Sequence, residues 1–190
     1  VSRGALKLFA ALDEFDISPE GHDCLDVGAS TGGFTHVLLE RGARRVIALD
    51  VGRGQLDWQL RNDSRVVVLE GVNARHLEAE ILPFTVSLVT VDVSFISLRL
   101  IVPALLPHSA ADAVIICLVK PQFEAGRDEV GKGGIVRDER VRRQTIDKTV
   151  RSLQDLGLAL VGLVESPIRG QKGNLEELAV FRRRNPPAKG

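Results

Sequence analysis

One short turn combines glycine, serine and carboxylate side chains in a pattern suited to holding a small molecule. It lies in CLDVGASTGGFTHVLL, residues 24–39, where an apolar run passes through D-x-G-x-S-x-G-G into a helical pattern. In an open parallel sheet, ligands bind beyond the carboxyl ends of the strands, and glycine there allows close approach to the backbone. We therefore expect a ligand to contact the residues of this turn, which are Asp26, Gly28, Ser30, Gly32, Gly33 and Phe34.

A second carboxylate, Asp50, ends the next apolar run, 24 positions beyond Asp26. A carboxylate at that place can accept hydrogen bonds from both hydroxyls of a ribose. Nicotinamide dinucleotides and S-adenosylmethionine (SAM) both carry such a ribose. The turn lacks the G-x-G-x-x-G spacing of a dinucleotide-binding fold, because Ser30 occupies the position of the second glycine. A tight turn with a purely structural purpose is the alternative at this point.

Four charged side chains form a second candidate constellation. Asp92 and Lys120 each end an apolar run, so they fall at the same edge of the predicted sheet as the glycine turn. Lys7 precedes the first run, and Glu176 lies at the start of the last one. Two ammonium and two carboxylate groups without an evident structural reason indicate an active site, and the alternative is a set of unrelated surface charges.

Seven apolar runs alternate with helical patterns, which is typical of a parallel sheet with crossover helices on both faces. Apolar spacing predicts one helix before the first strand, with Lys7 off its apolar face, and another capped by Asp138 and stopped by Gly157. The later helix carries an apolar stripe of Ile146, Val150 and Leu153. The predicted strands span residues 23–27, 45–50, 66–70, 86–92, 113–120, 158–165 and 175–181.

Composition narrows the function classes. The 190 residues are 44% hydrophobic and 26% charged with zero net charge, so a single folded domain is expected without a global basic field. Cys24 and Cys117 lie in apolar runs and are expected to be reduced, as in a cytoplasmic protein. No apolar run approaches the 18 residues of a membrane span, and we expect neither a membrane nor a metal ion among the partners.

Basic residues nevertheless gather beside the one long glycine-rich loop, residues 125–138. Long loops in compact domains are often functional. From charge alone, a solvated helix face is the first interpretation of four arginines at the end of this loop and in the helix after it, and RNA contact is the alternative, which becomes our expectation with the family resemblance given next. These residues are Arg137, Arg140, Arg142 and Arg143.

Seven ordered motifs make the chain resemble the TlyA family of ribosomal RNA methyltransferases, also labelled hemolysin A-like, which carries an FtsJ-like catalytic domain. They are VSRGALKL, DVGASTGGFT, ALDVGRGQLDWQLR, VDVSFISL, LVKPQFEAG, GKGGIVRD and GNLEELAV. The resemblance implies a Rossmann-like, seven-stranded, mostly parallel α/β fold and SAM-dependent methylation of a ribose 2′-hydroxyl in ribosomal RNA or ribosomal subunits, with cytidine as the nucleotide. The family's K-D-K-E tetrad falls on Lys7, Asp92, Lys120 and Glu176.

The resemblance also implies further details. Asn73, after the third strand, is placed to meet the adenine edge of SAM, although a turn residue is an equal alternative. Lys120 would act either as the base or as an electrostatic stabiliser. The adjacent Glu177 competes with Glu176 for the acidic tetrad position, and Glu176 is preferred because it follows Gly-Asn-x.

Two residues depart from the family pattern. Arg53 stands where an aromatic residue is typical, and Gly71 stands where a basic residue is common. Residues 1–184 are expected to form the methyltransferase domain and residues 185–190 a tail. The family's N-terminal RNA-binding domain is expected to lie outside these 190 residues. The alternatives to an active methyltransferase are a catalytically weak RNA- or ribosome-binding protein and a membrane-active hemolysin.

Overall fold

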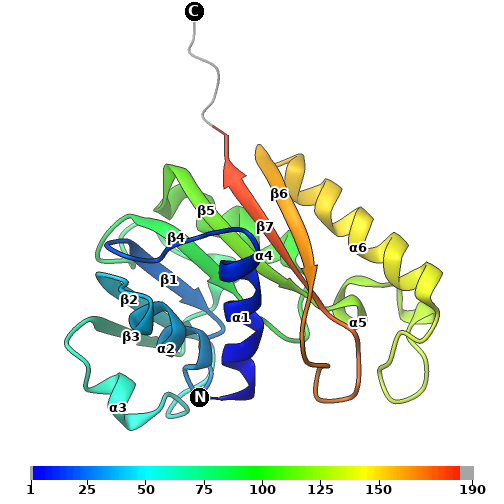
Figure 1. The fold of residues 1–190 in the computed structure, drawn as a ribbon, viewed down its shortest axis with the longest axis horizontal. Coiled ribbons are helices and arrows are strands. Elements are labelled where there is room, and N and C mark those ends of the chain that lie inside the picture. Colours follow the sequence, from blue (N-terminus) through cyan, green and yellow to red (C-terminus); the bar gives the residue numbers. More distant parts are fainter. Residues whose placement is uncertain (1, 185–190) are drawn as a thin grey trace, which may run out of the picture.

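A computed structural model describes residues 2–184 and shows one seven-stranded sheet (Figure 1), while the predicted tail at 185–190 lies outside the described residues. The strand order is β3-β2-β1-β4-β5-β7-β6, and β7 is the strand that runs antiparallel to its neighbours. The predicted fold class, a mostly parallel seven-stranded sheet, is confirmed. The strands are β1 Asp23–Val27, β2 Arg45–Asp50, β3 Val66–Glu70, β4 Val86–Val91, β5 Ser109–Val119, β6 Leu158–Glu165 and β7 Glu177–Arg183.

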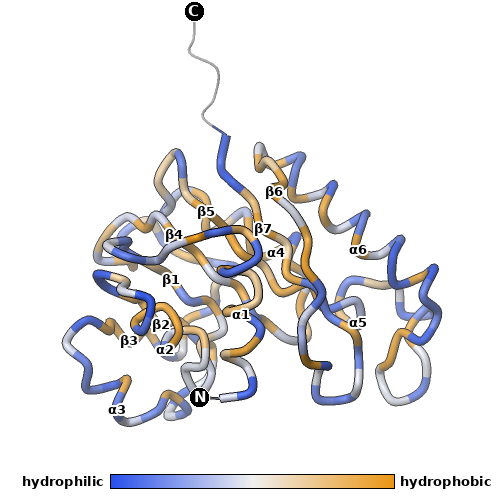
Figure 2. The backbone as a smooth tube through the Cα atoms, in the orientation of Figure 1, coloured by the Kyte–Doolittle hydropathy of each residue, from blue (hydrophilic) through white to orange (hydrophobic). Residues whose placement is uncertain are grey.

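Helices cover both faces of the sheet, as its hydrophobic strands require. Buried residues of α1 and α2 pack with one set of strand side chains, and those of α4 and α6 pack with the alternate set. Figure 2 shows that hydrophobic residues, drawn in orange, are concentrated along the strands. The helices are α1 Arg3–Glu14, α2 Gly33–Glu40, α3 Trp58–Arg61, α4 Leu98–Leu105, α5 Pro121–Glu124 and α6 Glu139–Gln154, with 3-10 turns at Ala74–His76, Leu106–His108 and Arg127–Glu129.

Helix α6 begins where the sequence predicts. The Asp138 side chain accepts hydrogen bonds from the backbone N–H groups of Arg140 and Val141, which satisfies two free donors of the first turn. The helix ends at Gln154, and Gly157 follows with a φ of 88°, a conformation that glycine adopts without strain. The predicted cap and stop are therefore confirmed.

Two strands begin at residues other than those predicted. Strand β5 begins at Ser109 rather than 113, because Ser109 pairs with Val86 ahead of a register shift in β4. Strand β7 begins at Glu177 rather than 175, because the Asn174 side chain is hydrogen-bonded to another loop, at the backbone of Gly134 and Val136. Within residues 2–184, no helix is both long and apolar enough to cross a membrane.

Candidate functional site

The glycine turn ties together the carboxyl ends of three neighbouring strands. The N–H of Gly28 donates to the carbonyl of Leu49, and the N–H of Asp92 donates to that of Val27, both at 2.9 Å. Gly28 has a φ of 80°, and a Cβ atom placed on it would lie 2.0 Å from the carbonyl oxygen of Asp92. Only glycine fits this position, so the turn presents bare backbone where the strands end.

Asp50 holds the turn and faces a hollow beside it. Its carboxylate accepts from the N–H of Ser30 at 2.7 Å and from that of Gly52 at 2.8 Å. A carboxylate has about four acceptor sites, so it can still accept from ribose hydroxyls. Asn73 lines the same hollow while its side chain caps the 3-10 turn by accepting from the N–H of Arg75. The apolar side chains in the lining are Val27, Leu49, Val51, Val72, Ala74, Val93, Phe95, Ile96 and Ile101.

Asp26 differs from the expectation that it touches the ligand. Its fully buried carboxylate accepts from the hydroxyls of Thr35 at 2.7 Å and Thr90 at 3.1 Å. Burial raises the pKa of Asp26 to about 7, against the effect of these two hydrogen bonds. Asp26 therefore supports the turn from beneath the pocket instead of lining it.

The other turn residues divide into two groups. Gly33 and Phe34 line a hollow that also contains Lys7 and Asp92. Gly32 lines a different hollow, and a Cβ atom there would lie 2.2 Å from the Leu60 side chain. The sequence pattern predicted the same ligand contact for all three positions, whereas in the structure they border different hollows.

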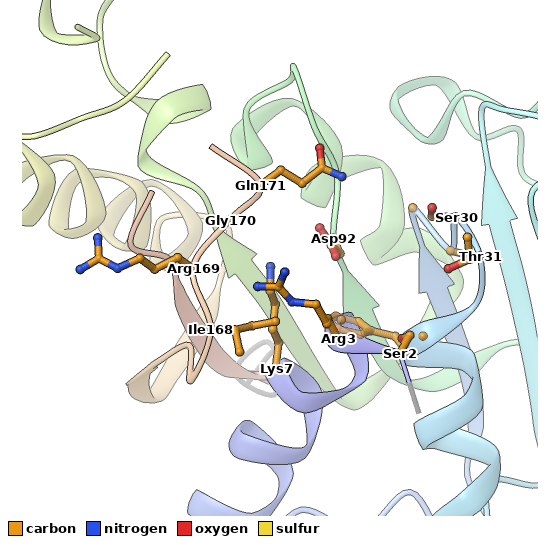
Figure 3. A pocket seen from close by; sticks show the side chains of 15 residues that line it. Ser2, Arg3, Lys7, Ser30, Thr31, Asp92, Ile168, Arg169, Gly170 and Gln171 are labelled. Atoms are coloured by element: carbon orange, nitrogen blue, oxygen red, sulfur yellow. The ribbon is translucent and has the colours of Figure 1, made fainter. Parts of the chain in front are cut away.

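The four tetrad residues meet in one hollow as two ion pairs. Lys7 Nζ donates to Glu176 Oε2 at 2.7 Å, and Lys120 Nζ lies 2.6 Å from Asp92 Oδ1. Figure 3 shows Lys7 pointing from its helix toward the edge of the sheet where Asp92 lies. Lys120 Nζ also donates to the Ser94 hydroxyl at 3.1 Å. Four side chains that are far apart in the sequence thus converge on one small volume.

The parallel sheet explains this convergence. Asp92 and Lys120 directly follow the adjacent strands β4 and β5, and Glu176 directly precedes β7, which pairs with β5 in the opposite direction. Glu176 and Glu177 point to opposite faces, as successive strand residues do. Glu177 accordingly pairs with Arg142 at 3.1 Å and Arg143 at 3.2 Å, so Glu176 alone of the two faces Lys7.

An exposed aromatic side chain at the mouth of the site was missed by the sequence analysis. Phe95 is 85% exposed and has a φ of 64°, a strained conformation for a bulky residue. Its ring lies 5.0 Å from that of Phe123, tilted by 50°, and it borders the hollows that contain Lys120 and Asp50. Its position three residues after Asp92 in VDVSFISL was the available signal.

The arginines expected to contact RNA do not all reach solvent. Arg137 and Arg140 are exposed, and Arg143 is half-exposed and paired with Glu177. Arg142 is buried, and its guanidinium is paired with Glu177 and Glu139. The expectation of a phosphate contact from Arg142 is therefore wrong, because this side chain links α6 to the sheet.

The two departures from the family pattern lie side by side. A Cβ atom on Gly71 would lie 2.3 Å from the guanidinium of Arg53. The Arg53 side chain thus occupies the space next to Gly71, and Gly71 stands at the position where a basic residue is common in the family. The cationic group is present there, but it comes from the loop after β2.

The fold and the site define a class of protein. A sheet of this order with one antiparallel strand, a glycine turn after β1 and a carboxylate ending β2 is the arrangement of Rossmann-like SAM-dependent methyltransferases. A candidate SAM-dependent methyltransferase from Listeria monocytogenes shares the fold with a TM-score of 0.66 at 16% identity, covering 94% of this chain and 100% of that one. The model of the FtsJ-like methyltransferase family matches residues 1–183. The chain belongs to the FtsJ-like methyltransferase family.

Closer relatives are also known. The 16S/23S rRNA (cytidine-2′-O)-methyltransferase TlyA of Mycobacterium tuberculosis is 54% identical over 176 residues, which is 93% of this chain and 66% of the relative. Hemolysin A of Brachyspira hyodysenteriae is 46% identical over 182 residues, 95% of this chain and 76% of the relative. A crystal structure of a candidate hemolysin from Lactococcus lactis has a TM-score of 0.94 at 47% identity, covering 97% of this chain and 89% of that one.

Proposed function

We propose that this domain transfers a methyl group from SAM to the 2′-hydroxyl of a ribose in ribosomal RNA, on a cytidine. The observation that carries the proposal is the meeting of the Lys7–Glu176 and Lys120–Asp92 pairs in a hollow that adjoins the glycine turn. The relative named for rRNA (cytidine-2′-O) methylation supports the choice of substrate.

Two rival functions account less well for these residues. A nicotinamide-dependent oxidoreductase gives no role to two lysines paired with carboxylates beside the turn. Some relatives carry the name hemolysin. A membrane-active protein, however, has no use for a carboxylate and bare backbone arranged to hold a nucleoside, next to four charged groups inside a hollow. Methyl transfer uses both features.

The residues of the Asp50 hollow fit a nucleoside-containing cofactor. Asp50 would accept from the ribose hydroxyls, Asn73 would meet the adenine edge, and the apolar lining suits a flat heterocycle. Ser30, Gly33 and Phe34 would border the methionine part, next to the backbone left bare at Gly28. When bound, SAM supplies an electrophilic methyl group on a sulfonium.

The acceptor ribose would enter the tetrad hollow with its base against Phe95. An exposed aromatic ring in a strained backbone conformation is suited to stacking on an unstacked base, a common mode of RNA recognition. The 2′-hydroxyl would then face Lys120, held by Asp92 and Ser94. Lys120 assists either by stabilising negative charge on the oxygen or by relaying its proton, and the Lys7–Glu176 pair fixes the opposite wall.

The test is single-turnover methylation of ribosomal subunits at saturating SAM, using full-length protein and mapping the modified nucleotide. We expect Lys120→Ala to bind SAM normally and to lose roughly 10²–10⁴-fold in rate, the usual contribution of proton transfer or charge stabilisation. Lys120→Arg should not restore the rate, because a guanidinium is planar and stays protonated. Lys148→Ala, an exposed lysine on α6, is the matched control.

Two results would contradict the proposal. Transfer near the wild-type rate by either Lys120 variant would remove this lysine from the reaction. A methyl group found on a base would exclude ribose methylation even if Lys120 proved essential.

A further inference from the structure

We infer that a basic groove next to the tetrad hollow holds the RNA phosphates that flank the methylated nucleotide. We call it the phosphate groove, and its exposed cations are Arg137, Arg169 and Lys172. The inference rests on the proposed function and adds to it the path of the RNA backbone. Two of the three cations, Arg169 and Lys172, were not among the residues that the sequence analysis assigned to RNA.

The phosphate groove is built by two loops that one buried side chain joins. Asn174 is 2% exposed; its Nδ2 donates to the carbonyl of Gly134 at 2.9 Å, and its Oδ1 accepts from the N–H of Val136 at 3.0 Å. The loop before α6 is thereby fixed to the loop before β7. The cations of the two loops consequently face a shared groove at fixed positions, as a binding surface requires.

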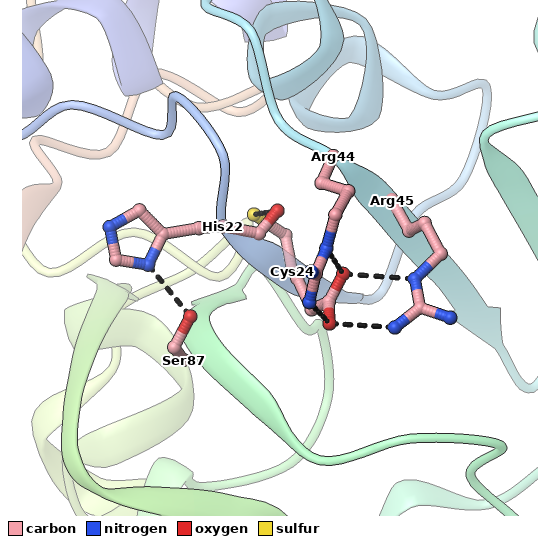
Figure 4. Close-up of polar contacts among 6 residues, drawn as sticks. His22, Cys24, Arg44, Arg45 and Ser87 are labelled. Carbon is pink, nitrogen blue, oxygen red and sulfur yellow. Dashed lines mark hydrogen bonds and ion pairs between the residues drawn. The ribbon is translucent and has the colours of Figure 1, made fainter.

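Seven arginines of the described chain form ion pairs, and the cations of the phosphate groove are not among them. Figure 4 shows a typical paired case at the far edge of the sheet, where Arg44 and Arg45 both bind the carboxylate of Asp23. The hydrogen bonds from Arg45 and Arg44 lower the pKa of Asp23 far below its usual range. Within residues 2–184, by contrast, Arg137, Arg169 and Lys172 have no carboxylate within ion-pair distance. Arg41, Arg61, Arg65, Arg142 and Arg143 are all paired.

The groove is continuous with the tetrad hollow. Lys172 lines both, and Arg169 lines both the groove and the hollow that contains Lys7. In Figure 3 the Arg169 side chain points away from Lys7 and Asp92. The Arg169 Nη1 donates to the carbonyl of Gly173 at 3.1 Å, which holds this side chain over its own loop.

The position of the groove favours phosphate over an acidic protein segment. A ribose in the tetrad hollow carries a phosphate on each side, and neither can stay beside the Asp92 and Glu176 carboxylates. The neighbouring groove is lined by four cationic side chains and two carboxylates, Glu139 and Glu165, and one of the cations, Arg142, is already neutralised. Arginine and lysine are the usual phosphate ligands.

The test compares two triple variants of the full-length protein that remove equal charge. The groove variant carries Arg137→Gln, Arg169→Gln and Lys172→Gln. The control variant carries Arg151→Gln, Arg182→Gln and Arg184→Gln, three exposed arginines outside the groove. Affinity for an unmodified ribosomal RNA fragment is measured over a potassium chloride series, and SAM affinity and the unfolding midpoint are measured for each variant.

We expect the groove variant to flatten the plot of log affinity against log salt by about 2, because each single-strand phosphate contact contributes about 0.7 to the slope. Its KM for RNA should rise while kcat at saturating RNA stays near the wild-type value. The control should keep both the slope and the KM. Equal slopes for the groove variant and the wild type would contradict the inference that the phosphate groove binds RNA.

The two proposals fail in different ways. If the wild type methylates no ribosomal subunit, the proposed function fails. If the wild type methylates and the two triple variants behave alike, the proposed function stands and the phosphate groove is wrong.

Discussion

Replacing Gly28 with alanine should destabilise the protein at the glycine turn, because the added Cβ atom has no space there. The added Cβ would lie 2.0 Å from the carbonyl oxygen of Asp92 and 2.8 Å from its carbonyl carbon, whereas real contacts of Cβ atoms stay beyond 3.0 Å. Both contacts are backbone atoms that no rotamer change can move. Overpacking costs about 1–3 kcal/mol, and the positive φ of 80° adds about 1–2 kcal/mol for a residue with a Cβ. The expected loss of unfolding free energy is therefore about 2–5 kcal/mol.

Gly21 provides the control that separates these two contributions. Its φ is 72°, but nothing lies within 4 Å of an added Cβ, so Gly21→Ala should cost only the conformational part, about 1–2 kcal/mol. Urea unfolding measures both losses, and calorimetry measures SAM affinity. Gly28→Ala should weaken SAM binding because it displaces Asp92 from the turn, and Gly21→Ala should not. Equal destabilisation and equal SAM affinity in the two variants would refute the close-approach argument.

Three further predictions address buried and strained groups. Because burial raises the pKa of Asp26 to about 7, the folded state holds its proton more tightly, so unfolding free energy should fall as pH rises from about 4 to about 7. Asp26→Asn should lack that part of the slope in urea unfolding at several pH values. Phe95→Gly should stay within about 1 kcal/mol of wild type, since relief of a strained φ of 64° offsets the entropy of glycine, while kcat/KM for RNA falls roughly 10-fold or more through lost stacking. Arg142→Met should lose about 3 kcal/mol of unfolding free energy while its RNA affinity stays unchanged. Arg140→Met should keep its unfolding free energy and lose RNA affinity. A drop in RNA affinity for Arg142→Met without a loss of stability would contradict the buried ion pair.

Parallel topology explains why much of the site was predictable. Once the apolar runs are assigned to one parallel sheet, the residues that follow them must meet at a single edge. Asp50, Asp92 and Lys120 could therefore be grouped without coordinates, and the structure places them around adjoining hollows. The position of the glycine turn could be predicted for the same reason, since its spacing marks the point where the first strand meets its helix.

The direction of side chains was harder to predict from the sequence, even where helical spacing indicated it. Arg142 lies four residues before Ile146, on the extension of the apolar stripe that predicted α6, so helical spacing alone places it on the buried face. Its charge suggested solvent instead, and Glu177 on β7 supplies the partner that makes burial possible. That partner could not be assigned from the sequence, because which of two adjacent glutamates faces α6 depends on the register of β7.

Loop contacts were the least predictable part of the site. The proximity of Arg53 to Gly71, and the joining of two loops by Asn174, involve residues in segments without periodicity. Such contacts depend on φ values and on side-chain hydrogen bonds that no apolar pattern encodes. The phosphate groove belongs to this category, which is why its lysine and one of its arginines emerged only from the structure.

The arrangement of charge separates the chemical parts of the proposed substrates. Each ammonium of the tetrad is matched by a carboxylate, so an uncharged ribose hydroxyl can enter, while a phosphate would face Asp92 and Glu176. In the proposed complex, Asp50 would present a carboxylate to the cofactor ribose on one side, and the cations of the phosphate groove line the other side. We therefore expect an RNA strand that binds at this edge to be held in one register, with a sugar next to the lysines and its phosphates directed outward. Under the proposed function, the neutral pairs at the centre and the unpaired cations at the side would act together, because either feature alone would leave the 2′-hydroxyl unaligned.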